Sequence, residues 1–255
     1  TTGSDNIAIG KAALATEDGH GRNVAIGSGA LYYLNAGLDA QNVAVGYNAG
    51  TVMTTGSYNV LLGGECGDAL TTGARNVAIG FRALGAEDAH GRNIAIGYNA
   101  LTAQDAGAEA YNVAIGYDTG KAVTTGVSNT FLGAQAGDAI TTAGYSVAIG
   151  HLALSSEDTG QYNTAIGYKA LYTQDGGVAN TVIGFQAGQF VTTGDDNTII
   201  GGEAGDALTT GSNNIIIGHD AAASAVDVSN EITLGDANIS AFRCADDSIA
   251  TLSDE

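Results

Sequence analysis

The chain of 255 residues contains no proline and no tryptophan, only one methionine and two cysteines, and eight basic residues against 27 acidic ones. The resulting net charge of −19 repels nucleic-acid phosphate and anionic membrane surfaces, so neither is expected as a partner. No apolar run approaches the roughly 18 residues of a membrane-spanning helix, and membrane insertion is not expected. We expect Cys66 and Cys244 to be single thiols, because coils spaced by about 4.8 Å would separate them by some 50 Å.

Glycine, by contrast, is abundant, with 39 residues, and it is periodic. The pentapeptide Asn23-Val24-Ala25-Ile26-Gly27 has fourteen copies, spaced by 17 residues except for two steps of 19. Their closing glycines are Gly10, Gly27, Gly46, Gly63, Gly80, Gly97, Gly116, Gly133, Gly150, Gly167, Gly184, Gly201, Gly218 and Gly235. A fixed short period over most of a chain predicts a solenoid. We assign residues 1–235 to this repeat domain and residues 236–255 to a tail.

A longer repeat of four coils lies over the short one. The string Glu17-Asp18-Gly19-His20 recurs 70 residues later as Glu87-Asp88-Ala89-His90, and a third copy begins at Glu157-Asp158 without the histidine. Thr-Thr-Gly corners occupy other coils of each block. This arrangement indicates duplication of a four-coil block.

Each coil is expected to contain a short strand at Val-Ala-Ile, followed by a corner at the glycine, which tolerates positive φ. A second short extended segment is expected before the Thr-Thr corners, as at 51–54 and 189–192. Stacked coils would pair these strands in parallel ladders. The prediction is an all-β parallel β-solenoid of about 14 coils, with a 17-residue period and a length of about 65 Å.

The two faces of the Val-Ala-Ile strand are both apolar. We expect the third strand position, which is always a branched aliphatic residue, to face the coil interior, and the middle position, mostly alanine, to face outward. A strand that is apolar on both faces is covered on both. The outward alanines therefore predict contact with other copies of the chain, and a homotrimer suits a rod with one such wall.

The motif Asn-x-Ala-Ile-Gly, as in 93–97 and 163–167, resembles the repeats of two groups of trimeric β-roll proteins: bacteriophage tail fibres and the heads of trimeric autotransporter adhesins. The variants at 98–101, 168–171 and 210–214 resemble the fibre repeats more closely. The resemblance implies a left-handed β-roll, a location in the extracellular tail fibre of a virion, other fibre or tail proteins as partners, and a host cell-surface glycan or protein receptor. An adhesin head and a purely structural spacer are the alternatives.

The C-terminal residues carry a second resemblance. Segments 229–235 and 239–244 are similar to the junction between a phage fibre and its C-terminal intramolecular chaperone. Ser253-Asp254-Glu255 resembles the opening of the chaperone's self-cleaving motif, in which a lysine follows the serine. No such lysine is present in this sequence, so no proteolytic activity is assigned. Because Thr1 begins partway through a repeat, we expect the chain to be a fragment or a processed product.

Two small sets of residues are candidate binding sites. The loops around Asp18, His20, Asp88 and His90 are weak candidates for cation binding, and solvated corner loops are the favoured interpretation, so no metal is assigned. Tyr32, Tyr33 and Tyr172 are candidates for receptor contact, since aromatic faces suit sugar rings. The aromatic residues that follow the coil glycine are expected to pack at a corner or between chains. They are Tyr47, Phe81, Tyr98, Tyr117, Tyr168 and Phe185.

Other functions fit the sequence poorly. The Thr-Thr pairs stack over only two coils at a time, as Thr54 with Thr71, so a continuous ice-binding array is not expected. The asparagines at the strand starts are expected to form an amide ladder. Four histidines and two lone cysteines, with no nucleotide-binding loop, provide no nucleophile–base pair, so we predict neither an enzyme nor a cofactor.

Overall fold

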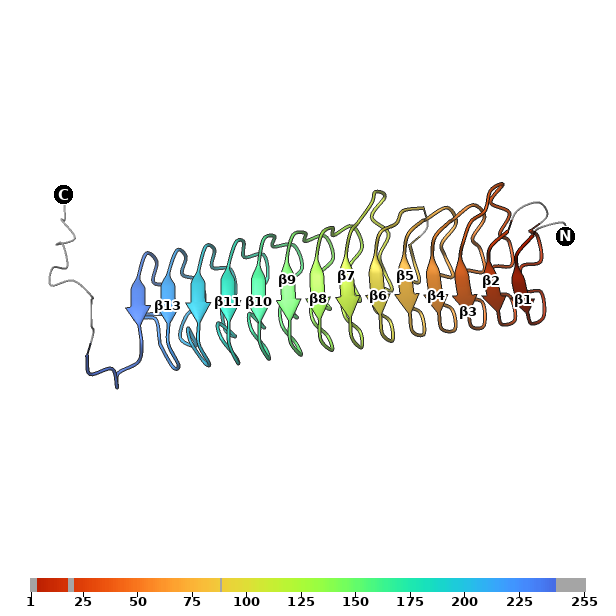
Figure 1. Cartoon of the computed structure of the whole chain (residues 1–255). Helices are drawn as coiled ribbons and strands as arrows, with labels where there is room; N and C mark the ends of the chain where they lie inside the picture. The colour runs from red at the N-terminus through yellow and green to blue at the C-terminus, as the bar shows by residue number, and fades with distance from the viewer. Residues whose placement is uncertain (1–3, 18–20, 88, 242–255) are drawn as a thin grey trace, which may run out of the picture.

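The computed structural model describes residues 4–17, 21–87 and 89–241. These residues form a rod of stacked coils that runs from β1 at one end to β14 at the other (Figure 1). Fourteen three-residue strands form one parallel sheet in chain order. They are β1 (Ile7–Ile9), β2 (Val24–Ile26), β3 (Val43–Val45), β4 (Val60–Leu62), β5 (Val77–Ile79), β6 (Ile94–Ile96), β7 (Val113–Ile115), β8 (Thr130–Leu132), β9 (Val147–Ile149), β10 (Thr164–Ile166), β11 (Thr181–Ile183), β12 (Thr198–Ile200), β13 (Ile215–Ile217) and β14 (Ile232–Leu234).

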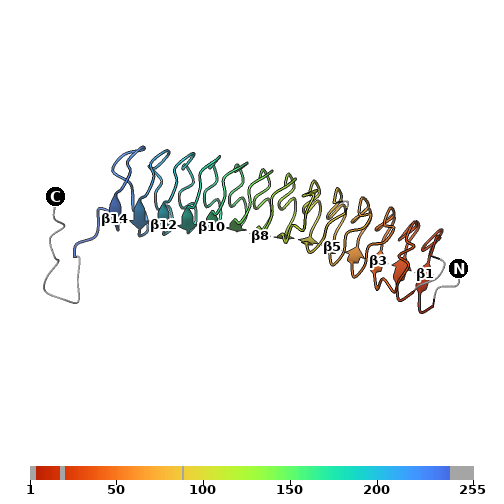
Figure 2. The same cartoon turned by 90° about the horizontal axis from the view of Figure 1, so that it is seen from above.

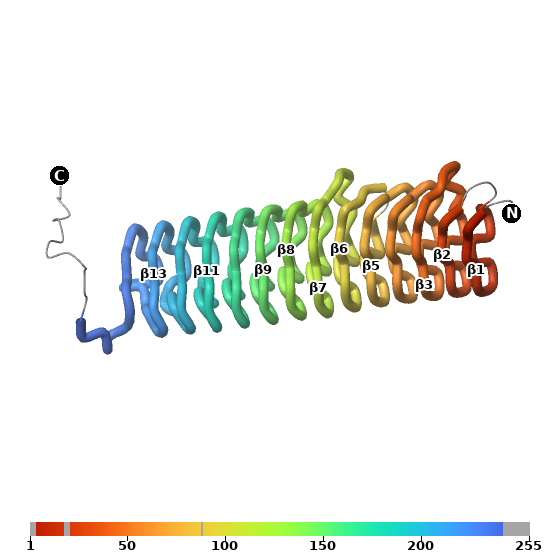
Figure 3. Tube along the Cα trace, in the orientation of Figure 1, coloured from red at the N-terminus to blue at the C-terminus, as the bar shows by residue number. Residues whose placement is uncertain are grey.

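Each strand pairs with the next at equivalent residues, so that Ala25 of β2 lies opposite Ala44 of β3. The predicted parallel β-solenoid with its 17-residue period is therefore confirmed. Figure 2 shows that the stack is gently bowed, and the tube in Figure 3 shows one coil following another without a break. The two coils of 19 residues project at the same edge of the rod, where the loops around 35–39 and 105–109 rise above their neighbours in Figure 1.

The glycine that closes each strand is required by close backbone approach. Gly97 has a φ of +138°, and a Cβ added there would lie 2.1 Å from the carbonyl oxygen of Gly116 in the next coil. A side chain at this position would separate the two coils. The repeating glycine is thus a condition for stacking as well as for turning.

The asparagine before each strand forms the predicted amide ladder. The Oδ1 atom of each accepts the backbone N–H of its equivalent in the next coil, as from Asn42 to Asn23 at 2.9 Å. The Nδ2 group donates across the coil, as from Asn42 to the carbonyl of Gly56 at 2.8 Å. Ser146 takes this place before β9, where its Oγ accepts from the backbone N–H of Asn163 at 3.3 Å, and Glu231 takes it before β14. Nearly all of these side chains are buried, so the ladder satisfies backbone groups that would otherwise lack partners.

The predicted orientation of the strands is wrong. The middle position, exemplified by Ala25, is fully buried inside the coil, whereas the flanking Val24 and Ile26 are only half-buried and face outward. Alternation alone cannot assign the inner face when both faces are apolar. Alanine suits the interior because a thin coil has room for few large side chains.

The coil interior is filled by complementary volumes. Where the middle residue is alanine, a buried leucine usually lies six residues later, as with Ala95 and Leu101. In the coils of Ala44 and Ala114 that place is Gly50 and Gly120, where a Cβ would meet side chains of the neighbouring coils, Leu61 and Phe131 among them. Where the middle residue is Phe131, the same place is Gly137, and a Cβ there would lie within 3.0 Å of the Phe131 ring. The same pairing of a large middle residue with a glycine six residues later is found for Leu61 with Gly67 and for Ile199 with Gly205. The four-coil block is therefore a packing unit as well as a sequence repeat.

The second extended segment expected in each coil is not a strand. Residues 51–54 and 189–192 run through turns and irregular backbone, and all fourteen strands of the described chain belong to the single sheet. Backbone hydrogen bonds between coils still form there, as from the Thr54 N–H to the Thr71 carbonyl at 2.8 Å. Thr-Thr corners thus support stacking without extended geometry.

Cys66 is a free, buried thiol, as expected. Burial raises its pKa to about 12, so the reactive thiolate is scarce at neutral pH. Cys244 lies outside the described residues.

Candidate functional site

The outward face of the sheet carries half-buried and exposed aliphatic side chains in every coil, although β8, β10, β11 and β12 begin with threonine. It consists of the first and third residues of each strand, and we call it the outward face. Among its members, Ile7, Ile9, Ile94, Leu132, Ile183, Ile200, Ile215, Ile217, Ile232 and Leu234 are large hydrophobic residues that are at least 36% exposed. Contiguous apolar surface of this kind is uncommon on monomeric proteins and marks interaction sites.

One edge of this face carries aromatic rings in six coils, four residues after the start of the strand. Phe81, Tyr98 and Tyr117 form a stack with ring centroids 5.6 and 5.4 Å apart, and Tyr168 stacks on Phe185 at 5.4 Å. All five are exposed. These rings were expected to pack at a corner or between chains; within the single chain they pack on one another along the rod.

The other edge carries tyrosine or arginine in seven coils, two residues before the strand. Tyr145 stacks on Tyr162 at 5.3 Å, and the guanidinium of Arg92 lies 5.3 Å from the Tyr111 ring centroid. Arg92 also forms an ion pair of 2.7 Å with Glu109 in the projecting loop of the next coil. The apolar centre of the outward face is therefore bordered by aromatic residues on both sides, as is common at protein interfaces.

The three tyrosines predicted to contact a receptor do not form one site. Tyr32 and Tyr33 follow β2 and contact each other edge to face at 4.5 Å, and Tyr33 is 54% exposed while Tyr32 is half-buried. Tyr172 follows β10, eight strands along the rod, where the Lys169 ammonium lies 5.0 Å from its ring centroid. Tyr33 offers the most accessible ring of the three.

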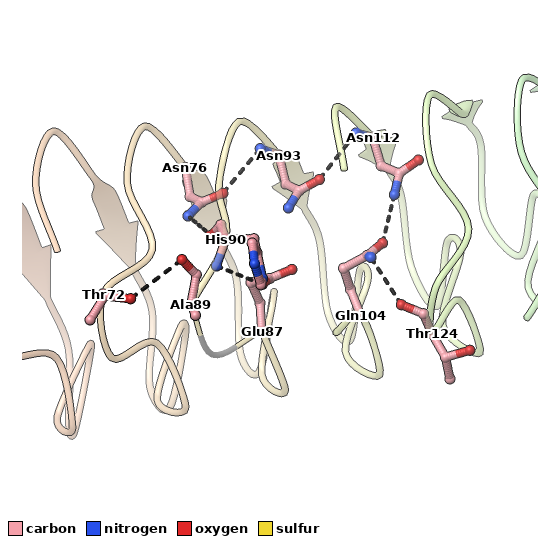
Figure 4. A network of polar contacts seen from close by, with 9 residues as sticks. All are labelled: Thr72, Asn76, Glu87, Ala89, His90, Asn93, Gln104, Asn112 and Thr124. Atoms are coloured by element: carbon pink, nitrogen blue, oxygen red, sulfur yellow. Dashed lines mark hydrogen bonds and ion pairs between the residues drawn. The ribbon is translucent and has the colours of Figure 1, made fainter. Parts of the chain in front are cut away.

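Of the weak cation-binding candidates, Asp18, His20 and Asp88 lie outside the described residues. His90 is described, and the structure places it beside a residue that the sequence reading missed. The backbone N–H of His90 donates to Glu87 Oε1 at 3.0 Å. Figure 4 shows the two side chains close together below the asparagine ladder.

Glu87 is one of three buried glutamates that recur every 70 residues, the others being Glu17 and Glu157, and all three are 0% exposed. They occupy the interior row that elsewhere holds Met53 and Leu70. The signal that could have located them was their recurrence at the place of apolar residues. Glu157 Oε1 accepts backbone N–H groups from Thr159 at 3.1 Å, Gly160 at 2.5 Å and Gly176 at 2.9 Å. The carboxylate thus fixes a corner of the coil.

Burial raises the pKa of Glu157 from its ordinary value of 4.5, and its three backbone hydrogen bonds only partly oppose this. The folded state therefore holds the proton more readily than the unfolded state, so this group favours folding below about pH 4.5, and that contribution is lost as the pH rises through the folded pKa. We expect the melting temperature of the wild type, measured relative to that of Glu157→Gln, to fall as the pH rises above about 4.5. The exposed Glu203→Gln is the control, and an equal change in both variants would contradict the assignment.

The described residues contain no pocket, and no helix among them has the length and hydropathy that a membrane span requires. No protein-family model, curated protein or solved structure matches the chain. The arrangement of exposed residues on the rod is thus the basis for an inference about function.

Proposed function

We propose that the chain is a structural and adhesive segment of a bacteriophage tail fibre, a stiff homotrimer of left-handed β-coils that presents loops to a host surface receptor. The proposal places it in the extracellular fibre of the virion, with other fibre or tail proteins at its ends. The observation that carries the proposal is the outward face, which holds an aliphatic residue at the third position of all fourteen described strands.

The repeat of the outward face supports other copies of the chain as the partner. Its side chains recur once in every coil, so a rod with a matching repeat is well suited to cover Ile94, Leu132 and Ile200 together. A second and a third copy of the chain meet this requirement, and each copy has one such face to bury. A closed three-fold arrangement places all three faces against a common axis and leaves none exposed.

Assembly through the outward face leaves other parts of each coil facing the solvent. The projecting loops at 35–39 and 105–109 and the ring of Tyr33 provide contacts of this kind (Figure 1). Three copies of each loop on one rod raise the effective concentration at a surface, so individually weak contacts can hold the fibre. The net charge of −19 favours neutral or cationic surface groups over anionic ones.

The adhesive role is tested by binding of the full chain to an array of bacterial surface glycans. We expect binding to at least one glycan and a loss of at least tenfold in affinity for Tyr33→Ala, because the exposed ring supplies stacking area. Tyr47→Ala is the matched control, since Tyr47 is as exposed but lies on the edge of the outward face. Absence of any binding would remove the glycan from the proposal, and unchanged binding by Tyr33→Ala would remove this residue.

A further inference from the structure

One group of three metal-ligating side chains of different types lies outside the outward face. Glu87, His90 and Asp105 bring two carboxylate oxygens and an imidazole nitrogen within 4.8 Å of one another. Glu87 and His90 follow β5, whereas Asp105 belongs to the next coil and follows β6. The group therefore joins two adjacent coils, at the point where the second 19-residue coil begins to project.

The backbone of each contributing segment is fixed by hydrogen bonds. The backbone N–H of His90 donates to Glu87 Oε1 at 3.0 Å, and the backbone carbonyl of His90 accepts from Asn76 Nδ2 at 3.3 Å (Figure 4). The Asp105 N–H donates to the Thr124 carbonyl at 2.9 Å. The ligands range from Glu87, which is buried, through the half-buried His90 to the exposed Asp105, so the group has both a rigid base and access to solvent.

The imidazole of His90 is the observation that indicates a ligand. Its Nδ1 atom is buried and has no hydrogen-bond partner among the described residues, and it lies 3.7 Å from Glu87 Oε1, beyond hydrogen-bonding distance. A buried nitrogen without a partner is uncommon in proteins. Two ligands of one tetrahedral Zn²⁺ ion, with bonds of about 2.1 Å, lie ~3.4 Å apart, so the observed separation is close to that of a shared ion.

The other two blocks of the chain differ at this place. Seventy residues later, Gly160 replaces the histidine, and backbone N–H groups of Gly160 and Gly176 bind the Glu157 carboxylate instead. In the first block, Asn35 stands in the place of Asp105. The full set of carboxylate, imidazole and carboxylate therefore occurs only in the second block of the described chain.

We propose that Glu87, His90 and Asp105 bind a divalent transition-metal ion of the Zn²⁺ class. Imidazole nitrogen with carboxylate oxygens is a donor set that suits zinc and its neighbours better than Ca²⁺ or Mg²⁺, which prefer oxygen ligands alone. The bound ion offsets the negative charge of the buried Glu87 and ties the coil of β5 to that of β6. The proposal does not rest on assembly through the outward face, and Asp105 begins the projecting loop of residues 105–109.

The test is calorimetric titration of the chelator-treated full chain with Zn²⁺ alone, with Co²⁺ absorption spectra as a second readout of imidazole coordination. We expect one ion per chain, and at least a tenfold loss of affinity in both His90→Gln and Asp105→Asn. His151→Gln, which removes an exposed histidine elsewhere, and Glu157→Gln, which alters the equivalent glutamate, should bind as the wild type does. Because Asp105 is exposed, its variant reports on binding even if the His90 variant is unstable. No binding by the wild type, or unchanged binding by Asp105→Asn, would overturn the proposal.

Discussion

Replacing Gly97 by alanine is expected to cause a large loss of stability. The new Cβ would lie 2.1 Å from the Gly116 carbonyl oxygen, and the residue has a φ of +138°, which L side chains rarely adopt. Backbone strain of this kind costs about 1–3 kcal/mol, and the displaced coil would add to it through the broken ladder. We expect Gly97→Ala to lower the unfolding free energy by at least about 3 kcal/mol.

Gly107→Ala is the matched control for this prediction. Gly107 also has a positive φ, +67°, but a Cβ there would meet nothing within 4 Å. Its substitution should cost only the left-handed backbone penalty of about 1–2 kcal/mol. Thermal unfolding followed by circular dichroism compares the two variants. Equal losses would show that inter-coil contact at Gly97 is not what requires glycine.

Substitution of Asn112 by alanine is expected to have the second large effect. Asn112 Oδ1 accepts the Asn129 N–H at 2.8 Å, and its Nδ2 donates to the Gly126 carbonyl at 2.8 Å and to Gln104 Oε1 at 2.6 Å. Alanine would leave these three buried groups without that partner, at a cost of about 3 kcal/mol or more. Chemical denaturation measures the difference in unfolding free energy.

Two further variants sharpen this prediction. Asn35→Ala removes an exposed asparagine side chain and should change the stability little. Asn112→Ser should recover part of the loss, because Ser146 already occupies the ladder and accepts a hydrogen bond from Asn163. If Asn112→Ala were as stable as Asn35→Ala, the buried ladder would contribute little to the stacking of coils.

The sequence was sufficient to predict the repeat, the strands and the ladder, because glycine, asparagine and the strand residues each recur at a fixed place. It was insufficient for the orientation of the strand, since Ala25 and its apolar neighbours Val24 and Ile26 give no polar face to compare. The orientation depends on the volume inside the coil, which is shared with residues such as Leu31 that lie on the far side of a turn. The alternation of residues along one strand does not show how much space the coil interior offers.

The candidate metal ligands were predicted only in part, for a similar reason. His90 was identified, but Asp105 lies in the next coil and Glu87 was assigned to a solvated loop. Carboxylates are seldom buried, so an acidic string is ordinarily an exposed one. Only the stacking of coils places Asp105 beside His90.

The solution mass of the full chain, measured by light scattering, tests the central claim most directly. The outward face, which includes Ile183 and Ile200, predicts a mass three times the 25.3 kDa of one chain. Ile183→Asp together with Ile200→Asp should shift this mass toward that of the single chain while the circular dichroism signal is retained, because both side chains point away from the coil interior. A wild-type mass near 25.3 kDa with an intact solenoid would contradict assembly through this face.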